Sequence, residues 1–365
     1  MAQRVLRDVE VVARAGLDID TFMEESLASV SRAVPHVGAC LATVDPSTLL
    51  LTGTHKYGDL QGRDEHDLEW GLIEYGTVEP SSFAELARRE EPVLAVDPAS
   101  STRVADFMDP YFGYTDELRV VFRDRGTVWG GAALFRDGTD GGFDDADVAL
   151  LAALSPVMSV GMRAGLLTRM AADLPPATSG PAVIIVGDDD TVQQMSAGAE
   201  ERLADMVGST AMADPAAVVS GLVGAARRFA RGETSTPPRC RMRSRSGMWL
   251  VLHATPLSPR DGRAGDVVVT IDEARPPEIV PLVVAAFDLT PRERDVTQLV
   301  LQGVDTKEIA ATIHVSTYTV QDHLKSVFDK AGVRSRRELI ARIYFDQYVP
   351  RMGTEVGPSG WFAGV

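Results

Sequence analysis

The 365-residue sequence has no lysine between Lys56 and Lys307. A P-loop holds nucleotide phosphates with a Gly-Lys-Ser/Thr triplet, so this gap argues against an ATP-hydrolysing regulator. A phosphoacceptor receiver domain needs a lysine beyond its acceptor aspartate, and the acidic run Asp188–Asp190 is followed by none in its region. We therefore interpret that run as a solvated β-turn.

Cysteine and histidine are also scarce. The two cysteines, Cys40 and Cys240, lie far apart in the chain, so no disulfide framework is predicted and a reducing compartment fits. The six histidines show no H-x-x-x-H spacing and there is no C-x-x-C, so we expect no metal site and no cofactor. G-x-S-x-G is absent and no catalytic pair stands out, so we expect no enzyme. Only a pocket placing Cys40 beside His55 would revive an enzymatic sensor.

Long apolar runs are missing as well. The N-terminal residues MAQRVLRDVE have no apolar signal-peptide core. The longest uncharged apolar stretch, Val148–Met162, contains Pro156 and is too short to span a bilayer. We therefore expect a soluble cytoplasmic protein that has no membrane partner.

From Leu289 to about Ile343 the sequence predicts four short helices. The predicted helix-capping residues are Thr290, Asp305 or Thr306, Ser316 and Ser335, and the predicted C-terminal glycines are Gly303 and Gly332. Thr290 to Glu293 read T-P-R-E, which is a capping box with proline at the first helical position. Two helices joined by a turn as short as His314-Val315 form a helix-turn-helix, which places its second helix in the DNA major groove.

This segment resembles the LuxR (GerE-type) DNA-binding domain. It matches L-T-x-R-E, K-E-I-A, S-x-x-T-V-x-x-H-L and G-V-x-S-R in that order. The resemblance implies an all-α, four-helix DNA-binding domain over residues 289–350. A helical bundle used for oligomerisation is the alternative.

The resemblance implies that the N-terminal half of the third helix reads base edges. Gln321 suits adenine, Asp322 could accept from cytosine N4, and Lys325 suits guanine. Asp322 departs from the neutral or basic residues usual at its position, and it could instead act against certain phosphate placements. The expected phosphate contacts, which position rather than specify, are Lys307, Thr317, Tyr318, Thr319, Lys330, Arg334 and Arg336. The fourth helix is the usual dimer face in this family, and its candidates are Leu339, Ile343 and Tyr344.

The net charge of −16 is unusual for a DNA-binding protein. Residues 1–174 contain 15 Lys and Arg against 29 Asp and Glu, whereas residues 286–351 contain 10 against 9. The acidity therefore lies in the N-terminal region. Because a strong non-specific binder is far more basic, we expect affinity to require a dimer and specific contacts.

Residues 1–171 are predicted to form an α+β sensory domain. A pair of helices in residues 1–35 is followed by strands at 37–44, 49–54 and 92–96, a hairpin over 117–136 and a helix from 143 to about 170. Helical patches lie near 64–75 and 81–89, and an aromatic-rich loop follows them. The strand VWGGAALFR, the helix start FDDADVALLAALSP and the N-terminal helix pair resemble a GAF domain.

Seven aromatic residues of this domain could line a ligand cavity between the first sheet and its covering segments. They are Trp70, Tyr75, Phe107, Tyr111, Phe112, Tyr114 and Trp129. The alternative is that they are core or loop-anchoring residues.

A Pro/Ser/Gly-rich linker, residues 172–181, separates this domain from the next. Residues 181–274 have the order β-β-α-α-β-β-β and resemble a small PAS domain. Residues 275–288 are expected to form a connecting helix, and residues 351–365 a flexible Gly-rich tail.

The sequence thus predicts a multidomain transcription regulator, with α+β GAF-like and PAS-like domains ahead of a LuxR-type domain. We expect a homodimer that binds double-stranded DNA at an inverted-repeat operator and responds to a small-molecule effector, with RNA polymerase as a further partner. The alternative effector is a protein that docks on the acidic N-terminal domain. The bias of arginine over lysine suggests a high-GC bacterium.

Overall fold

The computed structural model of the chain describes residues 1–139, 141–168, 180–206, 215–258 and 265–344. These form two compact units, one over residues 1–273 and the other from residue 274 onward. Almost all of the predicted linker (172–181), the last residues of the predicted DNA-binding domain (345–350) and the whole predicted tail (351–365) lie outside the described residues.

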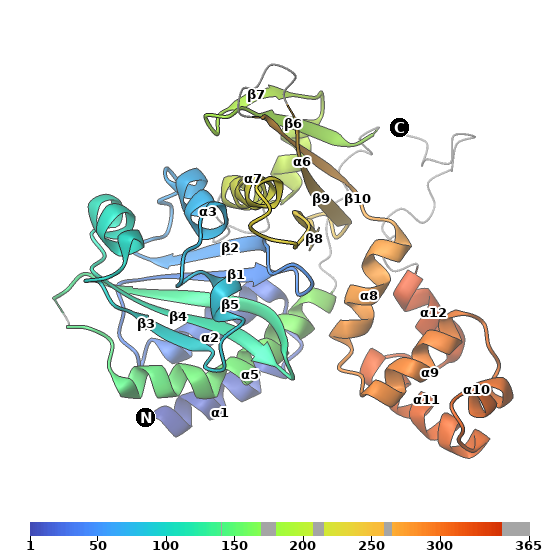
Figure 1. The fold of residues 1–365 in the computed structure, drawn as a ribbon. Helices are drawn as coiled ribbons and strands as arrows, with labels where there is room; N and C mark the ends of the chain where they lie inside the picture. Colours follow the sequence, from blue (N-terminus) through green and yellow to red (C-terminus); the bar gives the residue numbers. More distant parts are fainter. Residues whose placement is uncertain (140, 169–179, 207–214, 259–264, 345–365) are drawn as a thin grey trace. The chain divides into compact units, whose positions relative to one another are not determined.

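The first sheet is antiparallel, with the strand order β2-β1-β5-β4-β3 (Figure 1). Its strands are β1 (Gly38–Val44), β2 (Leu51–Gly58), β3 (Val93–Val96), β4 (Asp116–Asp124) and β5 (Thr127–Arg136). Strands β4 and β5 form the expected hairpin. Arg125 and Gly126 both have positive φ at its turn, which is the conformation that suits the twist of a two-residue hairpin.

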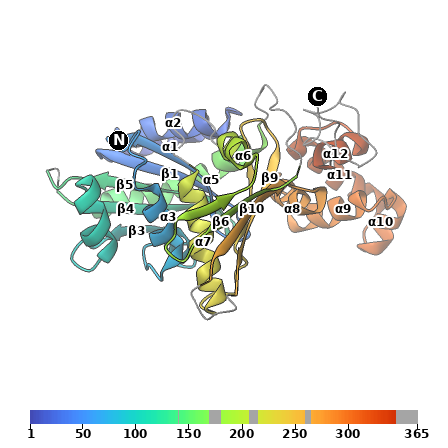
Figure 2. The ribbon, with the colours of Figure 1, turned by 90° about the horizontal axis from the view of Figure 1, so that it is seen from above.

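Three helices, α1 (Ala2–Ala13), α2 (Ile19–Val30) and α5 (Asp145–Leu167), pack together beside this sheet, and α5 contacts β4 (Figures 1 and 2). Asp144 begins α5 with a capping box that includes Asp147. A Cβ on Gly161 would lie 2.0 Å from the Phe22 ring, so α5 meets α2 at van der Waals distance. Helix α5 is long and apolar enough to cross a membrane by length and composition. Half of its apolar stretch is buried, as in a core helix.

The opposite side of the sheet carries α3 (Asp67–Gly76), α4 (Phe83–Leu86) and the π-helix η1 (Val104–Phe112). The prediction of a loop around Phe107 and Tyr111 is therefore wrong, because these residues are helical. Val104, Phe107, Met108 and Phe112 form the buried stripe of η1, and Gly113 ends it with a φ of 76°. The turns of a π-helix are wider than those of an α-helix, so the buried residues of η1 do not follow the α-helical spacing that a sequence pattern would reveal.

The second sheet is also antiparallel, with the order β7-β6-β10-β9-β8. Its strands are β6 (Ala182–Val186), β7 (Val192–Met195), β8 (Arg239–Arg243), β9 (Trp249–Pro256) and β10 (Val267–Glu273), and helices α6 (Ala199–Met206) and α7 (Ala216–Ala230) lie between β7 and β8 in sequence. This is the order of elements that the sequence predicts.

The two predicted domains of residues 1–273 are not separate bodies. Helix α3 packs along α7, where Gly71 and Gly224 allow the backbones to meet. Asp45 at the end of β1 accepts hydrogen bonds from the Arg241 side chain at 2.7 Å, and both residues are buried. A single apolar cluster includes Val44 of the first sheet and Leu252 of the second. Residues 1–273 therefore form one unit with a continuous core.

The second unit contains five helices among its described residues. They are α8 (Pro276–Ala286), α9 (Pro291–Leu301), α10 (Thr306–Thr312), α11 (Thr317–Ala331) and α12 (Arg336–Tyr344). The predicted connecting helix, α8, contacts α12 and buries Ile279 and Leu282. It is therefore part of this unit and not a free connector.

A buried polar cavity and a candidate DNA-binding surface

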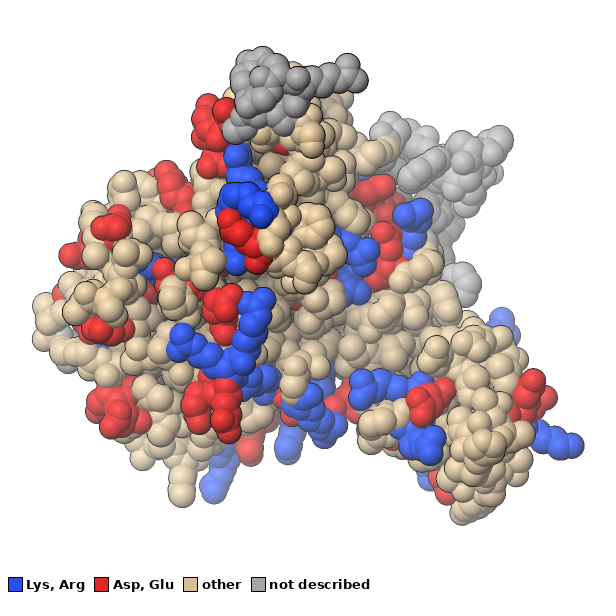
Figure 3. All heavy atoms as spheres, viewed as in Figure 1, with Lys and Arg blue, Asp and Glu red and all other residues tan. Residues whose placement is uncertain are grey.

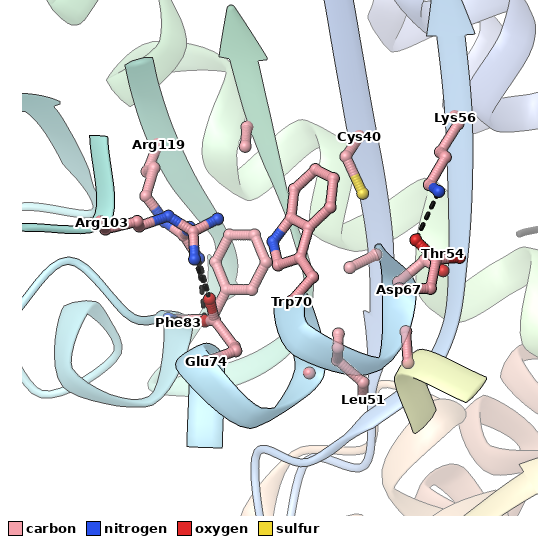
Figure 4. A pocket seen from close by; sticks show the side chains of 14 residues that line it. Cys40, Leu51, Thr54, Lys56, Asp67, Trp70, Glu74, Phe83, Arg103 and Arg119 are labelled. Carbon is pink, nitrogen blue, oxygen red and sulfur yellow. Dashed lines mark hydrogen bonds and ion pairs between the residues drawn. The ribbon is translucent and has the colours of Figure 1, made fainter. Parts of the chain in front are cut away.

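Four buried charged side chains, Glu74, Arg103, Glu117 and Arg119, meet between α3 and the first sheet, and Figure 4 shows three of them, Glu74, Arg103 and Arg119. Glu74 of α3 accepts hydrogen bonds from Arg119 Nη2 at 2.8 Å and from Arg103 Nη1 at 3.4 Å. Glu117 of β4 accepts from Arg103 Nε at 3.0 Å and from Arg119 Nη1 at 3.0 Å. Burial alone would raise the pKa of Glu117, but the charges of Arg103 and Arg119 hold it below its usual value. The four groups therefore form a charge-balanced square.

A second buried pair lies on the other side of Trp70. Lys56 Nζ donates to Asp67 Oδ1 at 2.5 Å, to Asp64 Oδ1 at 2.8 Å and to the Arg63 carbonyl at 2.6 Å. These three bonds use all three protons of the ammonium group. Lys56 is thus fully partnered inside the protein.

A small cavity lies between the two charged groups. Its lining includes Cys40, Thr54, Trp70, Arg103 and Arg119, and the centre of a water molecule can range over about 20 Å³ within it. In Figure 4 Trp70 stands between the arginines and Cys40. Burial raises the pKa of the Cys40 thiol to about 12, so this thiol is uncharged at neutral pH. The space suits one water molecule.

Most of the aromatic residues predicted to line a ligand pocket fill space instead. Of the seven, only Trp70 lines this cavity. The Phe112 and Phe107 rings pack against Trp70, with ring centres 5.6 and 6.1 Å apart. The Tyr114 ring stacks on Phe112. The other three of the seven aromatic residues do not line this cavity either. Tyr111 is 49% exposed, whereas Tyr75 and Trp129 are buried elsewhere. Apolar core residues and pocket residues have the same composition, which is why the sequence left both interpretations open.

The arrangement that would support an enzymatic sensor is not formed. His55 faces away from this cavity, and its Nδ1 lies 3.3 Å from Asp20 Oδ1. Burial lowers the pKa of His55, against the influence of Asp20. Across the described ranges no cluster of His, Cys, Asp and Glu could hold a metal ion.

In the second unit the helix boundaries follow from local capping. The Thr290 side chain accepts from Glu293 N and the Glu293 side chain accepts from Thr290 N, which completes the predicted capping box. Asp305 caps α10 and Ser316 caps α11. His314, with a φ of 57°, makes the turn between these two helices. The predicted helix-turn-helix geometry is therefore present.

Glu293 also joins the first of these helices to the third. Its Oε1 accepts from Ser326 Oγ at 2.6 Å, and its Oε2 accepts from Lys330 Nζ at 2.6 Å. Burial would raise the pKa of Glu293, but these donors and Thr290 lower it to about 2. Helix α11 is thus held against the start of α9 by a charged network.

Helix α11 has one buried and one exposed face. Val320, Leu324 and Val327 are buried against the other helices, whereas Gln321, Asp322 and Lys325 are exposed. The spacing of three and four residues separates the two faces. An exposed polar face on the second helix of this motif is what major-groove contact requires.

Residues 288–343 match the family described as bacterial regulatory proteins, luxR family. This segment is a LuxR-type helix-turn-helix domain. A putative HTH-type transcriptional regulator of Mycobacterium bovis, Mb0914c, is 50% identical over 52 residues, which are 14% of this chain and 6% of that protein. The spore germination protein GerE of Bacillus subtilis is 38% identical over 55 residues, 15% of this chain and 74% of GerE. The chain therefore spans only a small part of the length of the mycobacterial relative.

Solved structures give weaker likenesses. The Vibrio cholerae VqmA dimer in the absence of target DNA is 18% identical, with 47% of this chain and 89% of that chain covered and a TM-score of 0.21. The Escherichia coli DhaR(N)–DhaL complex is 13% identical, with coverages of 74% and 88% and a TM-score of 0.23. TM-scores this low support no conclusion about the fold.

The residues predicted to contact phosphates have different environments in the LuxR-type domain. Lys307, Thr317, Tyr318 and Arg334 are exposed, and Tyr318 is 71% exposed. Thr319 is half-buried, and its hydroxyl bonds the Ser316 hydroxyl. The Lys330 ammonium donates hydrogen bonds to the Glu293 carboxylate and to the Asp288 carbonyl. Arg336 donates to the Val304 carbonyl, in the segment between α9 and α10. The last two thus have a structural role that the sequence pattern did not indicate.

The predicted dimer residues of α12 need correction. Leu339 has no exposed surface and Ile343 is 5% exposed, because α12 packs against α8 and α11 within the second unit. Only Tyr344, which is half-buried, has surface available to a partner. An apolar residue at helical spacing on a terminal helix indicates burial, but the sequence alone does not say whether the burial is internal or between copies.

Proposed function

We propose that this chain is a cytoplasmic transcription regulator that binds double-stranded DNA through its LuxR-type domain. The observation that carries the proposal is the exposed polar face of α11, with Gln321, Asp322 and Lys325 outside a buried apolar stripe. Gln321 and Lys325 are the residue types that pair with adenine and guanine. Lys307, Thr317, Tyr318 and Arg334 are the phosphate contacts that we retain.

A single module of this kind reads few base pairs, so we propose a homodimer on an inverted repeat. The charge of the chain supports this requirement. Figure 3 shows acidic and basic side chains interleaved on the face it draws, with no extended basic surface. Because residues 286–351 contain 10 Lys and Arg against 9 Asp and Glu, non-specific attraction to phosphates is weak, and affinity comes from two half-sites read together. RNA polymerase is the further partner expected of a regulator.

We propose that residues 1–273 receive the signal, through a GAF-like first lobe and a PAS-like second lobe. The two antiparallel five-stranded sheets and their shared core support this assignment. A ligand that favours one arrangement of this unit over another would change how the DNA-binding domains of a dimer are spaced. A small molecule is the effector we favour, because a cavity with polar lining lies beside Trp70.

The alternative effector is a protein that docks on the acidic N-terminal region. The filled aromatic cluster around Phe107 and Phe112 supports it, since no large ligand volume is open there. A protein effector would leave the interior unchanged and contact the surface of residues 1–174, which carry 29 Asp and Glu.

The proposal is tested by footprinting the purified chain on the DNA upstream of its own gene. The experiment is run with and without cell extract. Protection of two half-sites, changed by a heat-stable small component of the extract, is the expected result. Protection that only a heat-labile, protein-sized component changes would support the alternative effector. Lys325→Ala, which removes a proposed base contact, serves as the negative control for sequence-specific protection. Absence of protected half-sites on any upstream fragment would refute the proposed function.

A further inference from the structure

Three buried polar groups around the cavity have no hydrogen-bond partner within the described part of the chain. They are Arg103 Nη2, Arg119 Nε and Thr54 Oγ1. All three residues are at least nine-tenths buried, and they come from separate segments: β2, β4 and the residue before η1. Buried polar groups in proteins are almost always paired. Three unpaired groups on one cavity indicate that it receives a molecule with hydrogen-bonding capacity.

The charges around the cavity are already matched. Arg103 and Arg119 are paired with Glu74 and Glu117, and Lys56 is paired with Asp67. A ligand with a net charge would enter a buried, balanced site without a counter-charge, which carries a large desolvation penalty. The occupant must therefore be uncharged. The free groups add a geometric requirement, because two of them are N–H donors that need an oxygen acceptor.

We propose that this cavity binds a small uncharged molecule that has a carbonyl or hydroxyl oxygen. The oxygen accepts hydrogen bonds from Arg103 and Arg119, and the Thr54 hydroxyl makes a further hydrogen bond to the same molecule. The apolar part of the molecule lies against Trp70 and Ala133, which also line the cavity. The proposal names the ligand class for the effector site of the proposed function, and its consequence for DNA rests on that function.

Ligand size links this site to the second lobe. The cavity has room for about one water molecule, so anything larger must displace a wall. One wall is α3, whose Asp67, Trp70, Gly71 and Glu74 line the cavity. A Cβ on Gly71 would lie 2.1 Å from Ser220 Oγ of α7, so the two helices have no space between them. Helix α3 therefore moves outward only together with α7, and occupancy is transmitted to the second sheet.

Probes of equal size and different charge test the ligand class. The full chain, labelled with ¹⁵N, is titrated with acetamide, acetate and ethylammonium while the tryptophan indole N–H signals are recorded by NMR. Trp70→Phe assigns the Trp70 signal among the four tryptophans. We expect acetamide to shift this signal saturably in the millimolar range, and we expect no saturable shift with acetate or ethylammonium. A linear response to acetamide would mean non-specific solvent contact, and equal saturation by acetate would contradict the charge argument.

A pair of threonine variants tests the position of the site. Thr54→Val removes the cavity hydroxyl with little change in volume. Thr52→Val is the matched control, because Thr52 lies on the same strand, is equally buried and bonds Thr43 Oγ1 away from the cavity. We expect Thr54→Val to bind acetamide about three- to tenfold more weakly than the unmodified chain does. The affinity of Thr52→Val for acetamide should equal that of the unmodified chain. Equal affinity for Thr54→Val and the unmodified chain would overturn the assignment.

The binding experiment contains no DNA. If footprinting fails, the proposed function is refuted while the ligand site stands. If acetamide binding fails, the ligand site is refuted while DNA binding stands.

Discussion

Glu293 connects the start of α9 to α11, and Glu293→Gln removes its charge while keeping its size. The carboxylate is buried and accepts hydrogen bonds from Thr290 N, Ser326 Oγ and Lys330 Nζ. These donors lower its pKa from the ordinary 4.5 to about 2. Such a shift corresponds to about 3 kcal/mol of stability at neutral pH if the unfolded chain has the ordinary value. We expect a loss of about 2 kcal/mol, because Lys330 is partly exposed and solvent screens its charge.

The pH dependence follows from the same shift. The folded-state pKa of Glu293 is depressed, so its contribution is complete above pH 4.5 and disappears as the pH falls toward 2. The difference in stability between the unmodified chain and Glu293→Gln should therefore be largest at neutral pH and should vanish over this window. The exposed residue Glu308, on α10, offers a matched control as Glu308→Gln.

Hydrogen exchange with mass spectrometry on the full chain measures this effect locally. Peptides that span α9 and α11 should exchange about thirtyfold faster in Glu293→Gln at pH 7, whereas peptides of residues 1–273 should be unchanged. Glu308→Gln should leave every peptide unchanged. Equal protection of α9 and α11 in Glu293→Gln and the unmodified chain at pH 7 would refute the reasoning, as would a difference that persists at pH 2.

Three further substitutions have defined outcomes. Lys325→Ala should weaken operator binding by about 1–3 kcal/mol in a fluorescence-anisotropy titration and leave the melting temperature unchanged, since its side chain is exposed; an unchanged affinity would remove it as a base contact. Gly71→Ala should lower the free energy of unfolding, measured with urea, by about 1–3 kcal/mol, because the added Cβ would overlap α7. Gly76→Ala should be tolerated, because its Cβ would lie 3.5 Å from the nearest atom. Equal stability of the two variants would contradict this packing. Asp45→Asn should destabilise residues 1–273 by about 3–5 kcal/mol in the same assay, because it leaves Arg241 buried opposite a neutral group; a loss below about 1 kcal/mol would show that the pair is not buried in solution.

The sequence alone determined the helix-turn-helix and most element boundaries, because the groups that set them are neighbours in the chain. Thr290 and Glu293 are three residues apart, as are Ser316 and Thr319, so the caps could be predicted from the local pattern. The hairpin at Arg125 and Gly126 is local in the same way. Tertiary packing stabilises these short helices, but the residues that cap them are neighbours in the chain, so the positions of the helix ends follow from local sequence.

Tertiary structure alone decided which charged residues are buried and what they contact. Arg103, Arg119 and Glu74 have the composition of surface residues, and the arginines lie 29 and 45 positions from the glutamate they meet. Asp45 and Arg241 are 196 positions apart, and their pairing joins what the sequence divides into two domains. Burial of a charge is favourable only when folding supplies its partner. Glu74 meets its arginines, and Asp45 meets Arg241, only across long separations in the chain. No local pattern therefore specifies these pairs, and the cavity beside Glu74 appears only in the folded chain.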